Sequence, residues 1–137
     1  MNAHTFAEIR AHIESTNTLV HEEPFIIGFE YQLEGSDRRQ SIFLAELKDD
    51  DDHRYLRIET TVIPLAHFDA EKCLRINQML RIGYLAVGDL ADTPYIKMCH
   101  NIPYSNLNME EIDTVIAYLG PLADDFENQF EDGADIS

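Results

Sequence analysis

Apolar side chains recur at every second position in three consecutive segments, residues 25–33, 40–47 and 55–63. Successive side chains of a β-strand point to opposite faces of the sheet, so this period predicts strands with one buried face. The two connections, at residues 34–37 and 48–53, are short and polar, as hairpin loops are. The three segments therefore predict an antiparallel meander whose apolar face must be covered by other elements.

The segment before the meander carries a helix signal. Thr5 and Glu8 form the capping-box pattern of a helix N-terminus. Phe6, Ile9 and Ile13 then recur at helical spacing, which predicts about three turns of helix with one apolar stripe. We expect this stripe to pack on the sheet.

A second helix is predicted after the meander. Asp69 is a suitable N-cap, Phe68 can pack back on Cys73 as a hydrophobic staple, and Gly83 is a suitable C-terminal residue. The helix has more apolar positions than one contact with a sheet needs: Cys73, Leu74, Ile76, Met79 and Leu80. We expect Cys73, Ile76 and Leu80 to face the sheet, which leaves Leu74 and Met79 as surplus apolar surface.

Two further strands, at residues 84–87 and 95–102, follow this helix, with residues 88–94 as a turn-rich connection. The last helix is then predicted to start at Asn108, whose cap is completed by Glu111. Its apolar positions follow helical spacing: Ile112, Val115, Ile116, Leu119, Leu122, Phe126 and Phe130.

Gly120 and Pro121 interrupt this pattern, and proline inside a helix predicts a kink or a break there. The predicted element order is α-β-β-β-α-β-β-α, an α+β domain with a five-stranded antiparallel sheet and three helices. It spans residues 1–130, and residues 131–137 are predicted to be an acidic C-terminal tail.

The charge balance is strongly acidic, with 26 Asp and Glu against 10 Lys and Arg and a net charge of −16. Such a surface repels phosphate backbones and anionic lipids, so nucleic acid and membrane partners are not expected. The acidity also serves solubility by itself. With only two cysteines, no signal peptide pattern and no long apolar run, we expect a cytoplasmic protein.

No residue pattern predicts chemistry, so we expect no catalytic residue, cofactor or metal, and not an enzyme. The aspartates at residues 49–52 lack the spacing of a calcium loop and read as a solvated hairpin tip. Cys99 and His100 point to opposite faces of a strand, so zinc binding with Cys73 would need a tertiary contact. Both cysteines are expected to be core residues.

The order of the elements, together with the residues at their ends, resembles the type III secretion chaperone-like fold and its YbjN-like relatives. This group includes small uncharacterised proteins of photosynthetic bacteria. The residues that carry this resemblance are Leu74, Asn77 and Leu80 leading to Gly83-Tyr84-Leu85, then Ile102-Pro103-Tyr104, and the acidic helix from Asn108. The resemblance implies a sheet with helices packed on it, commonly in a homodimer, that binds a segment of another protein.

The leading hypothesis is therefore a non-enzymatic protein-binding domain, chaperone- or adaptor-like, that forms a homodimer. Four apolar or aromatic residues are the predicted dimer interface: Leu74, Met79, Tyr84 and Tyr95. Six acids of the last helix are the predicted surface for a basic partner segment: Glu110, Glu111, Asp113, Asp124, Asp125 and Glu127. The alternatives are a solvated acidic face, a monomer, and a small-molecule-binding or enzymatic domain with a pocket between the sheet and the kinked last helix.

Overall fold

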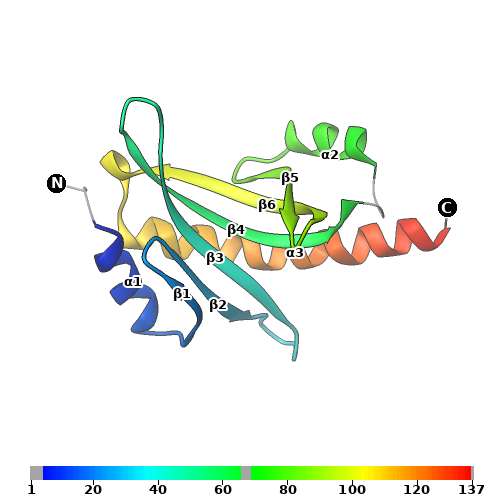
Figure 1. Ribbon diagram of the computed structural model, residues 1–137. Coiled ribbons are helices and arrows are strands. Elements are labelled where there is room, and N and C mark those ends of the chain that lie inside the picture. The colour runs from blue at the N-terminus through cyan, green and yellow to red at the C-terminus, as the bar shows by residue number, and fades with distance from the viewer. Residues whose placement is uncertain (1–4, 66–68, 137) are drawn as a thin grey trace.

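The computed structural model describes residues 5–65 and 69–136, with side chains described as far as residue 129. The chain is α+β, with three α-helices and one antiparallel sheet (Figure 1). The helices are α1 (Phe6–Glu14), α2 (Ala70–Asn77) and α3 (Met109–Ile136), and a short 3-10 turn, η2 (Tyr104–Asn106), precedes α3. The strands are β1 (Leu19–Glu23), β2 (Ile26–Gln32), β3 (Arg39–Lys48), β4 (Arg54–Pro64), β5 (Tyr84–Leu90) and β6 (Thr93–Pro103).

The sheet has six strands in the order β1-β2-β3-β4-β6-β5, so the prediction of five strands is wrong. The additional strand is β1, which pairs with β2 at one edge of the sheet. Four of its five residues are exposed, and it therefore lacks the apolar alternation that marks a half-buried strand. The predicted meander corresponds to β2, β3 and β4.

Helix α3 covers one face of the sheet and runs behind it in Figure 1, and α1 buries its apolar residues in the same core. The side chains between them are fully buried in the middle of the sheet, where Ile42, Leu44 and Ile58 have no exposed surface. On α1 the buried residues are the predicted stripe of Phe6, Ile9 and Ile13. We call this apolar side of the sheet the covered face.

Pro121 lies inside α3, which is one continuous helix, so the predicted break at this point is wrong. Pro121 and Ala117, the residue whose carbonyl loses its partner, are both exposed, so water can replace the missing hydrogen bond. Gly120 is buried against the sheet, where a Cβ atom would lie 2.9 Å from the ring of Tyr31. The glycine is therefore explained by close helix–sheet packing. The helix also extends through Ile136, across most of the segment predicted to be a tail.

Helix α2 lies beside β5 and ends at Asn77, earlier than the predicted end at Gly83. The Asn77 side-chain amide donates to the Leu85 carbonyl at 3.0 Å, and its oxygen accepts from the Leu85 N–H at 2.6 Å. Asn77 thus pairs with the free side of the edge strand as a neighbouring strand would. Cys73 is buried and Ile76 and Leu80 are partly buried against the core, as predicted.

The predicted helix caps are confirmed by their hydrogen bonds: the Thr5 hydroxyl, the Asp69 carboxylate and the Asn108 side chain each accept a backbone N–H of the first turn. The predicted staple by Phe68 lies outside the described residues.

The connection between the last two strands is shorter than the predicted residues 88–94, because β5 continues to Leu90. It is a tight turn at Ala91 and Asp92, both with positive φ. Among the described residues, no helix combines the length and hydropathy needed to cross a membrane.

Candidate functional site

The side of the sheet opposite α1 and α3, which we call the open face, carries side chains that are partly exposed to water. Along β3 and β4, fully buried residues alternate with partly exposed ones, and the partly exposed ones point away from α3. These side chains are mixed in chemistry: Ser41, Phe43, Ala45 and Leu47 of β3, and Tyr55, Arg57, Glu59 and Thr61 of β4. The open face continues across β6 and β5 through Tyr95, Lys97, Cys99, Asn101 and Tyr84.

Glu59 lies in the centre of the open face and contacts the two residues next to it on β6. Its Oε1 lies 3.2 Å from the Lys97 Nζ, and both side chains are 23% exposed. The Cys99 Sγ donates weakly to the Glu59 Oε2 at 3.8 Å. Burial, followed by the charge of Glu59, raises the pKa of Cys99 to about 12, so the thiol stays protonated at neutral pH.

A second polar group lies farther along the same face. The Arg57 Nε donates to the Asn101 Oδ1 at 3.0 Å, and the Asn101 Nδ2 donates to the Tyr84 hydroxyl at 3.1 Å. Arg57 also lies over the Tyr55 ring, with its guanidinium carbon 5.9 Å from the ring centroid. The open face therefore presents ordered polar and aromatic groups together.

A cavity of about 350 Å³ opens on this face where the tip of the β5–β6 hairpin stands over the central strands. Its lining combines apolar, charged and hydroxyl side chains: Ser41, Phe43, Glu59, Thr60, Thr61, Asp89, Leu90 and Lys97. Leu90 at the hairpin tip is 52% exposed. The arrangement can bind a ligand that has an apolar part and at least one charged or hydrogen-bonding group.

Two glycines make room for the long side chains of this cavity. A Cβ atom on Gly88 would lie 2.4 Å from the Lys97 Cε, and one on Gly28 would lie 2.7 Å from the Phe43 ring. Both side chains therefore extend across the backbone of a neighbouring strand. The His21 and Phe43 rings also pack in a T-shaped arrangement, with 5.9 Å between the ring centroids. Phe43 and Lys97 are thus positioned by the sheet itself.

The residues predicted for the dimer interface fall in two places. Leu74 on α2 and Met79 just after it are 71% and 78% exposed. Tyr84 and Tyr95 lie instead on the open face, near Cys99 and Gly88 on the neighbouring strand. The structure therefore confirms surplus apolar surface at α2, whereas the two tyrosines belong to the surface that contains the cavity.

The acids predicted to bind a partner lie on α3, but several have contacts within the chain. Asp113 accepts from the His12 Nε2 at 2.8 Å, and Asp124 pairs with Arg38 at 2.7 Å. Glu127 also has an interaction within the chain. The contacts of Asp113 and Asp124 connect α3 to α1 and to the loop before β3, so part of the acidic surface serves the packing of the helix.

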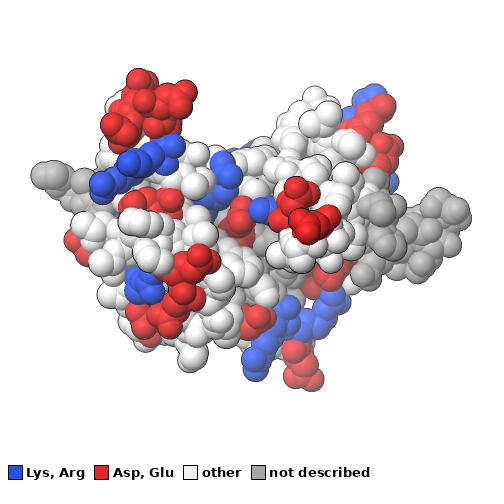
Figure 2. All heavy atoms as spheres, in the orientation of Figure 1, with Lys and Arg blue, Asp and Glu red and all other residues white. Residues whose placement is uncertain are grey.

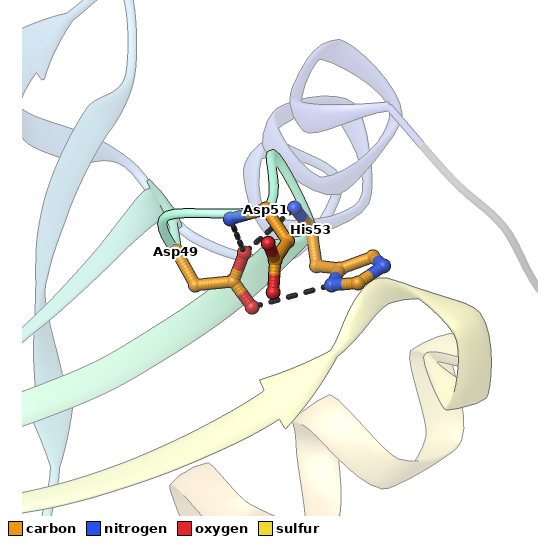
Figure 3. A group of neighbouring side chains, drawn as sticks. All are labelled: Asp49, Asp51 and His53. Carbon is orange, nitrogen blue, oxygen red and sulfur yellow. Dashed lines mark hydrogen bonds and ion pairs between the residues drawn. The ribbon is translucent and has the colours of Figure 1, made fainter.

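The aspartate loop joins β3 to β4 as a hairpin tip, as predicted (Figure 3). The Asp49 Oδ1 accepts the backbone N–H groups of Asp51 and His53, both at 2.9 Å. The bond from His53 lowers the pKa of Asp49, because it stabilises the ionised carboxylate. Ligand atoms of Asp49, Asp51 and His53 lie within 4.8 Å of one another, but all three residues are exposed. The hydrogen bonds between these residues close the turn.

Cys73, Cys99 and His100 are not brought together. Cys99 faces Glu59 on the open face, whereas the His100 Nδ1, on the covered face, accepts the N–H of Gly83 at 3.1 Å. Burial lowers the pKa of His100 because it disfavours the charged ring. Within the described residues, Asp49, Asp51 and His53 are the only cluster with metal-ligand spacing, and neither cysteine belongs to it.

No residue of α3 lines the cavity of the open face. The space predicted to hold a ligand between the sheet and the last helix is occupied by core side chains such as Leu119 and Ala123, which have no exposed surface. Comparison of this chain with models of protein families, with curated proteins and with solved structures found no match.

Proposed function

We propose that this chain is a non-enzymatic protein-binding domain, chaperone- or adaptor-like, and that a segment of another polypeptide lies along the open face of its sheet. The cavity under the β5–β6 hairpin supports this proposal best. It places an apolar wall, Phe43 and Leu90, beside the charged pair of Glu59 and Lys97. An extended polypeptide offers apolar side chains, charged side chains and amide groups in alternation, which matches this mixed lining.

The pair of Glu59 and Lys97 gives a specific test. A displayed library of random peptides would be selected on the wild-type protein, and the affinity of one selected peptide measured by fluorescence anisotropy. Exchanging the two charges, Glu59→Lys with Lys97→Glu, keeps an ion pair and the net charge of the chain. The proposal predicts that binding weakens about tenfold or more, because each charged group of the peptide then meets its own sign.

A matched control reverses a charge outside the open-face cavity: Arg81→Glu, on an exposed side chain after α2, should leave the affinity unchanged. The circular dichroism of all variants should match that of wild type. Failure to select any peptide, or equal binding by the exchanged variant, would contradict the proposal.

We propose further that the domain forms a homodimer through the apolar surface of α2. Leu74 and Met79 are among the most exposed large apolar side chains of the described residues, and a second copy would remove them from water. Light scattering should give twice the mass of 15.7 kDa for the wild type and the monomer mass for Leu74→Glu with Met79→Glu. A monomeric wild type at high concentration would refute the dimer and leave the peptide site untouched.

A second candidate function is the binding of a small molecule in the same cavity. Its volume of about 350 Å³ lies at the lower end of the range for small-molecule sites, about 300–1,000 Å³. A thermal-shift screen against metabolites separates the two functions, because a ligand that binds only the native state raises the melting temperature. A metabolite whose effect disappears in the exchanged Glu59 and Lys97 variant would favour this second function.

A further inference from the structure

A second cavity, of about 720 Å³, lies at the end of the sheet where α1 begins, outside the open-face site. Three of the ten Lys and Arg residues of the chain line it: Arg10, Lys48 and Arg54. Its remaining lining is Thr5, Phe6, Ala7, Pro24, Phe25, Glu46 and Leu47, in which Glu46 is the one acid. Figure 2 shows basic atoms gathered just below the acidic β3–β4 loop. In a chain with 26 acids and 10 Lys and Arg, three of the basic residues thus meet at one cavity.

The three cations differ in how far they are already paired. The Arg10 Nη1 contacts the Glu22 carboxylate at 3.1 Å, and this contact holds the guanidinium in place. Lys48 reaches only the exposed carboxylate of Asp52, at 4.0 Å, which is a weak contact. Arg54 makes no side-chain hydrogen bond or ion pair with any described residue. Among the described residues, Lys48 and Arg54 are therefore the two least paired of the three cations.

The other parts of the lining fit an anion that carries an apolar group. Phe25 is 57% exposed, an unusual state for a phenylalanine, and it stands beside Pro24 in the β1–β2 turn. The first turn of α1, at Thr5, Phe6 and Ala7, contributes the positive end of a nine-residue helix. The cavity thus combines a cationic wall with an apolar wall.

Arg54 also lines a neighbouring cavity of about 450 Å³ together with Tyr104. The Tyr104 hydroxyl is buried, and the neighbouring Glu46 carboxylate is an acceptor for its proton. An anionic oxygen held by Arg54 would add an acceptor to this region. Burial, and then the neighbouring Glu46 carboxylate, raise the pKa of Tyr104, so the hydroxyl keeps the proton that it could donate.

We infer that the cavity bounded by Arg10, Lys48 and Arg54 is a binding site for a small organic anion, a phosphate or carboxylate group joined to an apolar body. The anionic group lies between Lys48 and Arg54, and the apolar body lies against Phe25. This site is independent of the peptide site, because the two cavities share no lining residue.

Phenyl phosphate tests this inference, with inorganic phosphate and phenol as the anionic and apolar halves of the same probe. Isothermal titration of the full chain at low salt should show saturable binding of phenyl phosphate, with either half at least about tenfold weaker. Benzoate distinguishes the two anionic groups: saturable binding extends the site to carboxylates, and no binding restricts it to phosphates. Binding should weaken as sodium chloride is added, because exposed charges are screened.

Two double variants locate the site. Lys48→Ala with Arg54→Ala should weaken the binding of phenyl phosphate by about tenfold or more. Arg39→Ala with Arg81→Ala removes the same charge from exposed residues outside this cavity and should leave the affinity unchanged.

Backbone amide shifts of wild-type protein give a measurement that needs no variant. Phenyl phosphate should perturb the first turn of α1 and the residues around Phe25, Lys48 and Arg54. Absence of saturable binding, an equal loss of affinity in both double variants, or shifts confined to the open face would overturn the inference.

Discussion

The two faces of the sheet are built from the same strands but differ in almost every physical respect. Ile58 on the covered face of β4 has no exposed surface, whereas Glu59, the next residue, is 23% exposed and paired with Lys97. The covered face gains its stability from the burial of apolar surface, whereas the open face holds charges that water already stabilises. We infer from this difference that stability resides mainly on the covered face, and the binding that we propose is assigned to the open face.

The largest difference should appear when side chains of one strand are truncated on opposite faces. Ile58→Ala should lower the free energy of unfolding by about 2–5 kcal/mol, because it leaves a cavity between β4 and α3. Thr61→Ala, on the open face of β4, should cost less than about 0.5 kcal/mol. Urea unfolding measures both. Similar losses for the two variants would contradict the assignment of stability to the covered face.

A smaller effect is expected from the two glycines with positive φ. Gly83 lies against the covered face, and a Cβ atom there would lie 2.8 Å from Leu119 and 3.1 Å from the Cys99 carbonyl. Gly35 has the same type of backbone conformation but open space around it. We expect Gly83→Ala to cost about 2–4 kcal/mol and Gly35→Ala only about 1–2 kcal/mol. Thermal unfolding of the two variants gives this comparison, and equal costs would show that packing at Gly83 is loose.

The ion pair of the open face should matter little for stability. Glu59 and Lys97 remain partly solvated, so their coupling energy should be about 0–1 kcal/mol. A double-mutant cycle with Glu59→Gln and Lys97→Met measures it directly. A coupling much above this range would mean that the pair is a structural element, and the open face would then differ less from the covered face than we infer.

The smallest effect concerns pH. Burial lowers the pKa of His100 below its ordinary value of 6.5, so the unfolded chain binds a proton more readily than the folded one. The contribution of neutral His100 is complete above pH 6.5 and is lost as the pH falls toward the lowered pKa. Protonation also removes the acceptor used by the Gly83 N–H.

His100→Gln should therefore lose less stability than wild type as the pH falls below about 6.5. Other groups titrate in both proteins, so the quantity to compare is the difference between the two curves of unfolding free energy against pH. Parallel curves would indicate that the ring of His100 is solvated in the folded protein.

Much of the covered face could be predicted from the sequence, because hydrophobic periodicity reports local structure. The buried stripe of α1, the caps at Thr5, Asp69 and Asn108, and the buried positions of β4 follow directly from spacing. The strand β1 was missed because an exposed edge strand has no apolar period. Pro121 predicted either a kink or a break of the last helix, and the sequence did not decide between them, because the outcome depends on which side of the helix faces water.

The open face could not be predicted in the same way. Glu59 and Lys97 are 38 residues apart in the sequence, and they meet only because β6 pairs with β4 in one register, which shifts between Thr61 and Ile63. The cationic cavity depends likewise on the meeting of three separate elements at Arg10, Lys48 and Arg54. Such sites arise from topology, and no local pattern of residues signals them.

Photo-crosslinking tests the central claim most directly. Benzoylphenylalanine would replace Phe43 on the open face in one variant and Tyr118, an exposed residue on α3, in another. A peptide selected on the wild-type protein would be irradiated with each variant, and the crosslinked fraction measured by mass spectrometry. The account predicts strong crosslinking from position 43 and little from position 118. Crosslinking mainly from position 118, or none from position 43, would contradict it.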